Sequence, residues 1–387
     1  MPQIQAIASR LPVRTACDLF AGTTRVGQAL RLLGLHVHSN DLATYSEVLA
    51  LAYVVADESL DRGRLERIAS ELAQLEGREG YFTEEFCRRA RYLQPANGAR
   101  VDAIRDAIDG YELSCVERGV LLTALLQAAD RVDSTTGLQM AYLKEWAPRS
   151  YNALELRLPE LVHGPAGTAS RLDANVLATQ LDVDLVYLDP PYNQHSFFSN
   201  YHVWETLIRW DAPATYGVAN KRVDCSENRS AYNSKRRAAA ALQELLASLR
   251  APWLLVSLSD EGFHDADELE RQLHEHGYVG RVDVDARRYV GAQIGIYSPL
   301  GEKVGKISRL RNRESLLLVG PDASLVASAT GAGVSARPAP LARTRKAAVA
   351  QAAAARGRNE ADGAPSAVAA RNAAPAPAAT HGPRPRT

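Results

Sequence analysis

The sequence predicts an α/β fold, in which helices alternate with the strands of a largely parallel sheet. Residues 13–41 have the pattern of a strand, a glycine loop, a helix and a second strand that closes on an acid. Residues 183–188 form an apolar run typical of a buried parallel strand. Residues 238–319 continue the alternation of helical and strand patterns. Ligands of such sheets bind beyond the carboxyl ends of the strands.

The N-terminal unit has the arrangement of a nucleotide-binding motif. A strand over Val13–Phe20 leads through Gly22 into a helix over Arg25–Leu33, and the next strand ends at Asp41. Gly22 lets a ligand approach the backbone, because glycine has no Cβ. Asp41 follows it by about twenty residues, the separation expected for an acid that binds a ribose. Two plainer interpretations stay open, a tight strand–helix turn and a helix N-cap at Asp41.

The apolar run stops at Asp189, which is followed by Pro190, Pro191 and Tyr192. The prolines donate no backbone N–H and have a fixed φ, so the strand ladder must end there. A carboxylate, a stiff turn with free carbonyls and an exposed ring then lie together. This set suits a planar substrate with an exocyclic amine, whose two hydrogens Asp189 and a proline carbonyl accept while Tyr192 stacks on its face. The alternative is a surface turn with a solvated Asp189.

The remaining segments continue this pattern around a largely helical insertion at residues 60–150. After it, we expect helices at 238–249 and 265–276, and strands at 253–259, 278–284 and 314–319.

Composition indicates a large globular protein without a membrane segment. Of the 387 residues, 46% are hydrophobic, enough for an extensive core. No apolar run is long enough to cross a bilayer, and residues 1–14 lack the apolar stretch of a signal peptide. The four cysteines are scattered, as in a cytosolic protein with reduced thiols, and no pattern predicts a metal site. We therefore expect a cytoplasmic location.

The C-terminal residues 321–387 differ from the rest of the chain. They hold nine basic and three acidic residues, so this tail carries a charge of +6 and residues 1–320 a charge of −6. The tail is rich in Ala, Pro and Gly and has almost no aromatic residues, which predicts disorder. A flexible basic tail adds salt-sensitive attraction to a polyanion. The alternative is a solvated linker.

These motifs together resemble the DPPY-type DNA adenine-N6 methyltransferases, S-adenosylmethionine-dependent enzymes of the restriction-modification methylase group. The likeness covers roughly residues 16–320. Besides the two motifs it rests on residues 40–41, 97–105, 141–144, 173–174, 199–206 and 257–262.

The resemblance implies a Rossmann-like methyltransferase sheet with a largely helical insertion and a disordered C-terminal tail. The catalytic domain would comprise residues 1–59 and 151–320. Residues 60–150 would form the target-recognition region, and 321–387 the tail.

The resemblance also implies which residues bind the cofactor, S-adenosyl-L-methionine. Phe20 and Gly22 would line its pocket, with Asp18 near the methionine end. Asp41 would accept hydrogen bonds from the ribose hydroxyls, and Asp173 would contact the adenine amine. Where family members often carry a second glycine, this chain has Thr24. The residues before the first strand do not match the N-terminal cofactor motif that many relatives carry.

For catalysis, the resemblance implies that Asp189 and the Pro190 carbonyl bind the amine of the target adenine. Pro191 belongs to the same turn, and Tyr192 would stack on the base once it has left the duplex. We expect direct in-line transfer to N6, with no covalent enzyme intermediate and no metal.

Contacts with double-stranded DNA are expected from six residues: Arg88, Arg89, Arg91, Arg105, Tyr201 and His202. Arginine suits bidentate contact with phosphate or guanine. Tyr201 and His202, which come later in the chain than the DPPY motif, could cover the flipped base. The alternatives are ordinary exposed helix charges and a packing role for Tyr201.

Other functions stay open at this point, namely N4-cytosine methylation of DNA, methylation of an RNA amine, and a catalytically silent DNA-binding subunit. A cognate restriction endonuclease is a possible partner. The sequence does not predict the oligomeric state.

Overall fold

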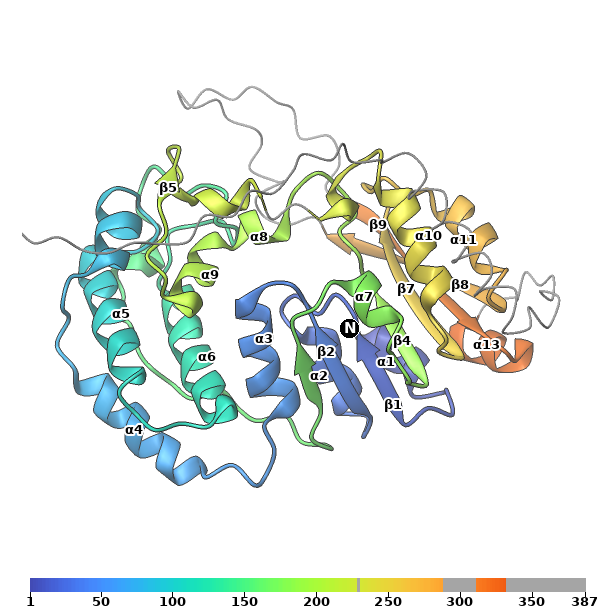
Figure 1. The fold of residues 1–387 in the computed structure, drawn as a ribbon, viewed down its shortest axis with the longest axis horizontal. Helices are drawn as coiled ribbons and strands as arrows, with labels where there is room; N and C mark the ends of the chain where they lie inside the picture. Colours follow the sequence, from blue (N-terminus) through green and yellow to red (C-terminus); the bar gives the residue numbers. More distant parts are fainter. Residues whose placement is uncertain (228–229, 288–310, 332–387) are drawn as a thin grey trace, which may run out of the picture. The chain divides into compact units, whose positions relative to one another are not determined.

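The computed structural model describes residues 1–227, 230–287 and 311–331, and contains a seven-stranded sheet in the order β3-β2-β1-β4-β7-β9-β8 (Figure 1). The strands are β1 (Thr15–Asp18), β2 (His36–Asn40), β3 (Thr168–Ser170), β4 (Leu185–Leu188), β7 (Trp253–Ser259), β8 (Tyr278–Arg287) and β9 (Arg311–Gly320). The first five strands in this order are parallel, and β9 is antiparallel to β7 and β8. The predicted α/β class and mostly parallel sheet are confirmed.

The order of the strands reverses between β1 and β4. From β1 the chain builds outward to β2 and later β3, whereas β4 pairs with the opposite side of β1 and leads to β7. At such a switch point the loops after the two strands diverge, which leaves a crevice beyond their carboxyl ends. The topology therefore places the candidate site after β1 and β4.

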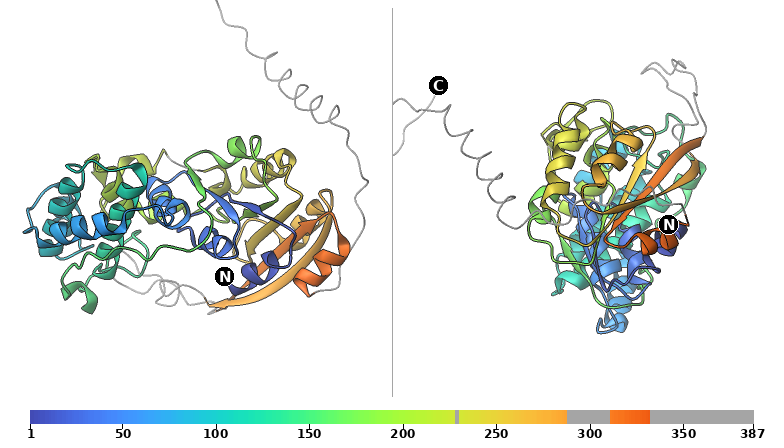
Figure 2. Two further views of the ribbon diagram at one scale, coloured as in Figure 1. Left: turned by 90° about the horizontal axis from the view of Figure 1, so that it is seen from below. Right: turned by 90° about the vertical axis from the view of Figure 1, so that its right-hand side faces the viewer.

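Apolar residues alternate between the two faces of the sheet, as the two-residue repeat of a strand requires. Leu185 and Tyr187 pack with one cluster, and Val186 and Leu188 pack with another. The first face is covered by α1 (Pro2–Ala8), α2 (Arg25–Arg31) and α13 (Ala323–Thr330) (Figure 2). The second is covered by α7 (Ala174–Ala178), α10 (Ala238–Ser248) and α11 (Ala266–Leu273). Both faces are thus buried.

A third hydrophobic cluster lies in a helical part beside the sheet (Figure 1). It is built from α3 (Thr44–Ala50), the π-helices η1 (Leu51–Val55) and η2 (Thr83–Arg88), α4 (Arg62–Gln74), α5 (Pro95–Ile108), α6 (Cys115–Arg131) and α9 (His202–Arg209). This cluster is wider than the predicted insertion at 60–150, because α3 and α9 complete its core. The short elements are η3 (Pro148–Tyr151), α8 (Phe197–Asn200), β5 (Thr215–Tyr216), β6 (Lys221–Arg222), η4 (Val223–Cys225) and η5 (Ala231–Asn233).

Arg105, which was predicted to face DNA, lies inside this helical part. Its side chain is 1% exposed, and its Nε and Nη2 donate hydrogen bonds to the carbonyls of Leu207 and Ile208, at 3.0 and 3.1 Å. It also pairs with Asp109 at 2.8 Å and lies over the Trp210 ring. The prediction for Arg105 is therefore wrong. Its guanidinium binds the free carbonyls at the end of α9 and joins α5 to it.

Replacing Arg105 with alanine should destabilise the fold by about 3 kcal/mol, because two charge-assisted hydrogen bonds and a packed stem are lost. Arg88→Ala is the matched control: Arg88 is exposed and pairs with Glu79 at the surface. We expect its effect to stay within about 0.5 kcal/mol. Urea denaturation followed by circular dichroism measures both. Equal effects of the two changes would contradict the structural role of Arg105.

The tail predicted from residue 321 starts too early, since α13 is an ordered helix. Val326 and Ala329 are 0% and 3% exposed, and Arg10 beside α1 donates a 2.8 Å hydrogen bond to the Ser328 carbonyl. A Cβ on Gly280 of β8 would lie 2.8 Å from Val326, so the helix packs directly on the strand. Apolar residues at helical spacing bury one face of α13. This burial stabilises the helix although the composition of residues 321–387 predicted disorder. Residues 332–387 of the predicted tail lie outside the described residues.

Two truncations separate the contribution of α13 from that of the residues after it. A chain ending at Gly331 should keep the thermal stability of the full protein. A chain ending at Gly320 should lose about 3 kcal/mol, because the apolar surface under α13 becomes exposed. Thermal denaturation of both proteins gives the comparison. If the two truncations melt together, α13 contributes nothing to the fold.

Candidate functional site

Three carboxylates gather at the carboxyl ends of neighbouring strands. Asp18 is the last residue of β1, Asp41 follows β2, and Asp189 follows β4. The register pairs Asp18 with Ser39 on one side and with Tyr187 on the other, which sets the three acids at one edge. Burial raises the pKa of Asp18, and the negative charges of Asp189 and Asp41 raise it further, so the three groups act on one another. The predicted cofactor loop and catalytic turn thus meet in one site.

The glycine loop between β1 and α2 is held by these acids. Gly22 has φ +51° and donates its N–H to Asp41 Oδ2 at 2.9 Å, and Gly27 donates to Asp18 Oδ2 at 2.9 Å. Thr24 is fully buried and also left-handed, with φ +61°. That conformation favours glycine and costs a β-branched residue about 1–2 kcal/mol. The backbone therefore keeps the shape of a two-glycine loop although the second position is threonine.

Asp18 has one carboxylate oxygen without a partner. The residue is 1% exposed, and its Oδ1 has no hydrogen-bond partner within the described ranges. Burial raises the pKa of Asp18 to about 7, the Gly27 N–H opposes this, and the two neighbouring acids add to it. An unpaired buried oxygen is costly unless a ligand supplies a donor or a positive charge. The ammonium group of a methionine moiety would fit this requirement.

Asp41 holds both ends of its loop. Its Oδ2 accepts the Gly22 N–H and its Oδ1 accepts the Ala43 N–H, at 2.9 Å each. The second bond lies at the start of α3. The N-cap residue of α3 is Ala43 and no side chain caps the helix, so the interpretation of Asp41 as a helix N-cap is wrong. Each carboxylate oxygen of Asp41 can still accept a further hydrogen bond, for instance from a ribose hydroxyl.

Phe20, which follows β1, packs against Tyr232, a residue that the sequence did not single out. Their rings meet edge to face with centroids 5.2 Å apart. The Tyr232 hydroxyl donates to Asn175 Oδ1 at 2.7 Å. Burial raises the pKa of Tyr232, and the negative charge of Asp173 adds to this. Asp173 itself is exposed and caps α7. Aromatic rings beside a carboxylate provide the chemistry needed to hold an adenine.

Asp189 lies at the carboxyl end of β4, and its acceptors are unused. No described residue donates a hydrogen bond to its carboxylate or to the carbonyl of Pro190. The side chain is exposed, yet crowding by surrounding protein raises the pKa of Asp189 to about 7, and the negative charge of Glu314 adds to this. Pro190 is buried, while Pro191 and Tyr192 are half-buried. The turn therefore offers two free acceptors next to an aromatic ring.

Two contacts fix the backbone of this turn from outside. Phe263 donates its N–H to the Tyr192 carbonyl at 2.7 Å, and a Cβ on Gly262 would lie 3.1 Å from Tyr192 Cβ. The Asn233 amide donates to the carbonyls of Asn193 and His195, at 2.8 and 3.1 Å. These clamps were missed from the sequence. Residues 257–262 carry part of the resemblance, but no pattern in the sequence predicted the contacts of Gly262, Phe263 or Asn233 with this turn.

The two residues predicted to cover a flipped base are placed differently. Tyr201 is half-buried, and its ring centroid lies 4.8 Å from that of Phe197, whose ring covers Gly22. His202 is 0% exposed, its Nε2 lies 3.0 Å from the Gln139 carbonyl, and burial lowers its pKa to about 3. The prediction for His202 is wrong, because this neutral ring is enclosed in the helical core. Tyr201 remains near the site.

Three of the arginines that were predicted to contact DNA are exposed, but each already has a partner within the protein: Arg88, Arg89 and Arg91. Arg88 pairs with Glu79, and Arg89 pairs with two glutamates of η2. Arg91 donates to the Lys144 carbonyl. Their role in DNA binding stays a prediction.

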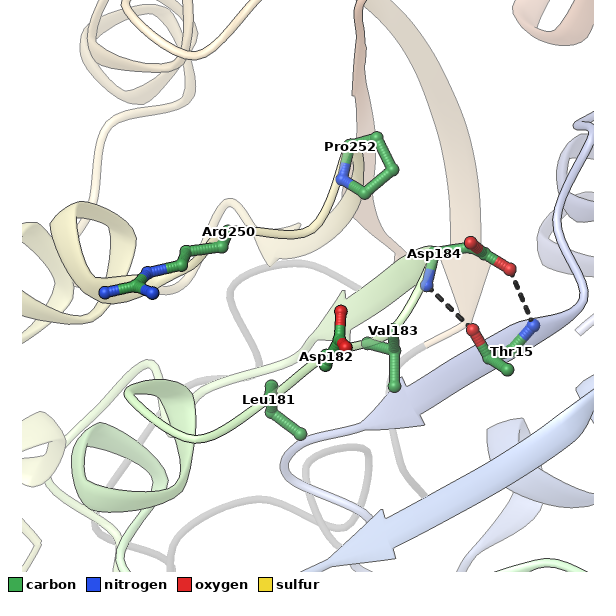
Figure 3. Close-up of a pocket in the computed structure, with 7 residues that line it drawn as sticks. All are labelled: Thr15, Leu181, Asp182, Val183, Asp184, Arg250 and Pro252. Carbon is green, nitrogen blue, oxygen red and sulfur yellow. Dashed lines mark hydrogen bonds between the residues drawn. The ribbon is translucent and has the colours of Figure 1, made fainter. Parts of the chain in front are cut away.

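A small cavity lies at the amino ends of the strands, opposite the candidate site (Figure 3). It has a volume of about 180 Å³ and is lined by Thr15, Leu181, Asp182, Val183, Asp184, Arg250 and Pro252. Asp184 accepts the N–H groups of Arg14 and Thr15 and donates its own to the Thr15 hydroxyl. These bonds connect the amino ends of β1 and β4, so we assign the cavity a structural role.

Metal and membrane features are both absent from the described residues. These residues hold no group of three or more His, Cys, Asp or Glu side chains arranged for a metal ion. Within the same part of the chain no helix is both long and apolar enough to cross a membrane.

Comparison with known proteins agrees with this geometry. The D12 class N6 adenine-specific DNA methyltransferase family matches residues 1–253. The chain is 30% identical to the modification methylase StsI of Streptococcus sanguinis, over 69% of this chain and 43% of that protein. It is 31% identical to the type II methyltransferase M.FokI of Planomicrobium okeanokoites, over 67% and 42%. For the type II methyltransferase M.NlaIII of Neisseria lactamica the identity is 28%, over 70% and 83%.

The chain spans less than half the length of the first two relatives, and most of the third. The family match covers both halves of the site, from the glycine loop to the turn after β4. The chain belongs to the D12 class of N6 adenine-specific DNA methyltransferases, a family of enzymes that use a methyl donor.

Proposed function

We propose that this chain methylates N6 of an adenine flipped out of double-stranded DNA at a specific recognition sequence, with S-adenosyl-L-methionine as methyl donor. The observation that carries the proposal is the pair of unused acceptors, the Asp189 carboxylate and the Pro190 carbonyl, at the switch point of the sheet. An exocyclic amine has two hydrogens and matches this pair. The target must leave the duplex, because pairing and stacking otherwise enclose the amine.

The residues after β1, β2 and β3 suit the cofactor. When bound, S-adenosylmethionine supplies an electrophilic methyl group on a positively charged sulfur. The unpaired Oδ1 of Asp18 would bind its ammonium group, and Asp41 would accept bonds from its ribose. Phe20, together with Tyr232 and Asp173, would hold its adenine. Positive charge on the ligand would also relieve the repulsion between Asp18 and Asp189.

Asp189 and Pro190 would act on the amine itself. The adenine amine is a weak nucleophile because its lone pair is delocalised into the ring. Two acceptors aimed at its hydrogens favour a pyramidal nitrogen and stabilise the positive charge that develops on it, which is electrostatic preorganisation. Stacking on Tyr192 would contribute about 1–3 kcal/mol, comparable with the cost of extruding the base.

The relatives carry names of modification and type II methyltransferases, so we place the chain in a restriction-modification system with a cognate endonuclease. Nucleoside analysis of the methylated product separates adenine N6 from cytosine N4 and DNA from RNA. A wild-type chain that binds DNA without methyl transfer would instead favour the silent subunit.

Asp189→Ala should lower incorporation of labelled methyl groups into DNA at least about a hundredfold, because the transition state loses an acceptor. Binding of S-adenosylmethionine, measured by calorimetry, should persist in this variant and be lost in Asp18→Ala. Asp182→Ala is the matched control, since Asp182 is an exposed acid at the other end of β4. Activity retained by Asp189→Ala would refute the assigned role.

The pH profile of kcat/KM should fall on the acidic side with a midpoint near pH 7, where Asp189 and Asp18 take up protons. Protonation removes the negative charge that these acceptors need, so activity is present above this pH and lost below it. Glu314→Gln should move the acidic limb to lower pH, because removing a neighbouring negative charge lowers the pKa of Asp189. Glu275→Gln, on the exposed turn after α11, should leave it in place. An unshifted limb in Glu314→Gln would contradict the coupling.

A further inference from the structure

A short basic segment lies beside the catalytic turn. It joins η5 to α10, and we call it the basic surface: Lys235, Arg236 and Arg237. Asn233, two residues before it, donates hydrogen bonds to the carbonyls of Asn193 and His195. The basic surface is therefore tied to the turn that carries Asp189, although forty residues of sequence separate Asn193 from Asn233.

The backbone of this segment is fixed. The N–H groups of Arg237 and Ala238 both donate to the Ser234 carbonyl, at 2.9 and 2.8 Å. The Arg237 carbonyl then accepts the first helical bond of α10, from Ala241 at 2.9 Å. The three side chains thus project from a defined turn at the start of an eleven-residue helix.

The charges of the basic surface are exposed and unpaired. None of its three side chains makes a hydrogen bond or ion pair with another residue in the described part of the chain. Three arginines of the helical part differ in this respect: Arg88, Arg89 and Arg209 each form an ion pair with an acid. Free cations are available to an outside anion without first breaking an internal pair.

We propose that the basic surface binds phosphates of the DNA backbone next to the extruded base, an inference that rests on the proposed function. Arginine and lysine bind phosphate through charge-assisted hydrogen bonds. A base that rotates out of the duplex must be held by its flanking backbone, and cations tied to the catalytic turn are placed to do this. The contact reads no sequence, because phosphates are the same at every base pair.

The test compares two double variants that remove the same charge. Arg236→Gln with Arg237→Gln removes two charges of the basic surface. Arg14→Gln with Arg250→Gln removes two exposed arginines at the amino ends of the strands, away from the proposed site and from residues 60–150. Affinity for a DNA duplex is measured by fluorescence anisotropy over a range of salt concentrations, together with KM for DNA and calorimetric binding of S-adenosylmethionine.

The first variant should bind DNA about tenfold more weakly, and the slope of log affinity against log salt should fall by about 2, near one unit per lost phosphate contact. KM for DNA should rise, and cofactor binding should not change. The control variant should match wild type. Arg236→Lys with Arg237→Lys should restore the slope, because charge alone supports the counterion effect.

An unchanged slope in the glutamine variant overturns the inference while wild-type methylation stands. If the glutamine variant melts early, failure of the lysine variant to restore the wild-type slope overturns the inference as well. A wild-type chain that neither binds nor methylates DNA overturns the proposed function, and the inference with it. Tighter binding of an RNA duplex than of DNA would assign the basic surface to another nucleic acid.

Discussion

The parallel pairing of β2, β1 and β4 imposes the constraint on which the site depends. It brings Asp18, Asp41 and Asp189 to one edge of the sheet, where their charges oppose one another. The backbone N–H groups of Gly22 and Ala43 neutralise part of this charge at Asp41, and that of Gly27 does so at one oxygen of Asp18. The site keeps a net negative charge, and some of its carboxylate oxygens have no hydrogen-bond donor. Such a site favours ligands that bring positive charge on one side and N–H groups on the other.

Rigidity is the second requirement, because unused acceptors are effective only if they cannot turn away. Two consecutive prolines restrict the turn, and long-range contacts complete it: the Phe263 N–H on Tyr192 and the Asn233 amide on the two carbonyls of Asn193 and His195. Phe263 and Asn233 thus hold the backbone that follows Asp189. Preorganisation of this kind avoids reorganising dipoles during the reaction, which is the main source of electrostatic catalysis.

The sequence predicted the features that local patterns encode. The strand before Asp189 and the unit from β1 to β2 were visible as apolar runs that end at turn-forming residues. The wrong predictions concern residues whose environment depends on segments far away in the sequence. Arg105 looks like any helix arginine until α9 presents free carbonyls to it. His202 follows the catalytic motif closely, yet Gln139 and the helical core enclose it. Helix α13 has a biased composition, but Val326 finds a partner on β8. None of these partners is near in sequence.

Basic residues are subject to the same dependence on distant partners. Arg88 and Arg89 belong to a basic cluster in the insertion at residues 60–150, where the resemblance predicts the target-recognition region. In the fold, each of them already has an acidic partner. Binding DNA through them would exchange one ion pair for another, and exposed exchanges of that kind yield little free energy. Cations without an internal partner gain the full release of counterions from the phosphates. A basic side chain that has no acidic partner and lies near the proposed active site is therefore a better candidate for a nucleic-acid contact than one that belongs to a basic cluster in the sequence.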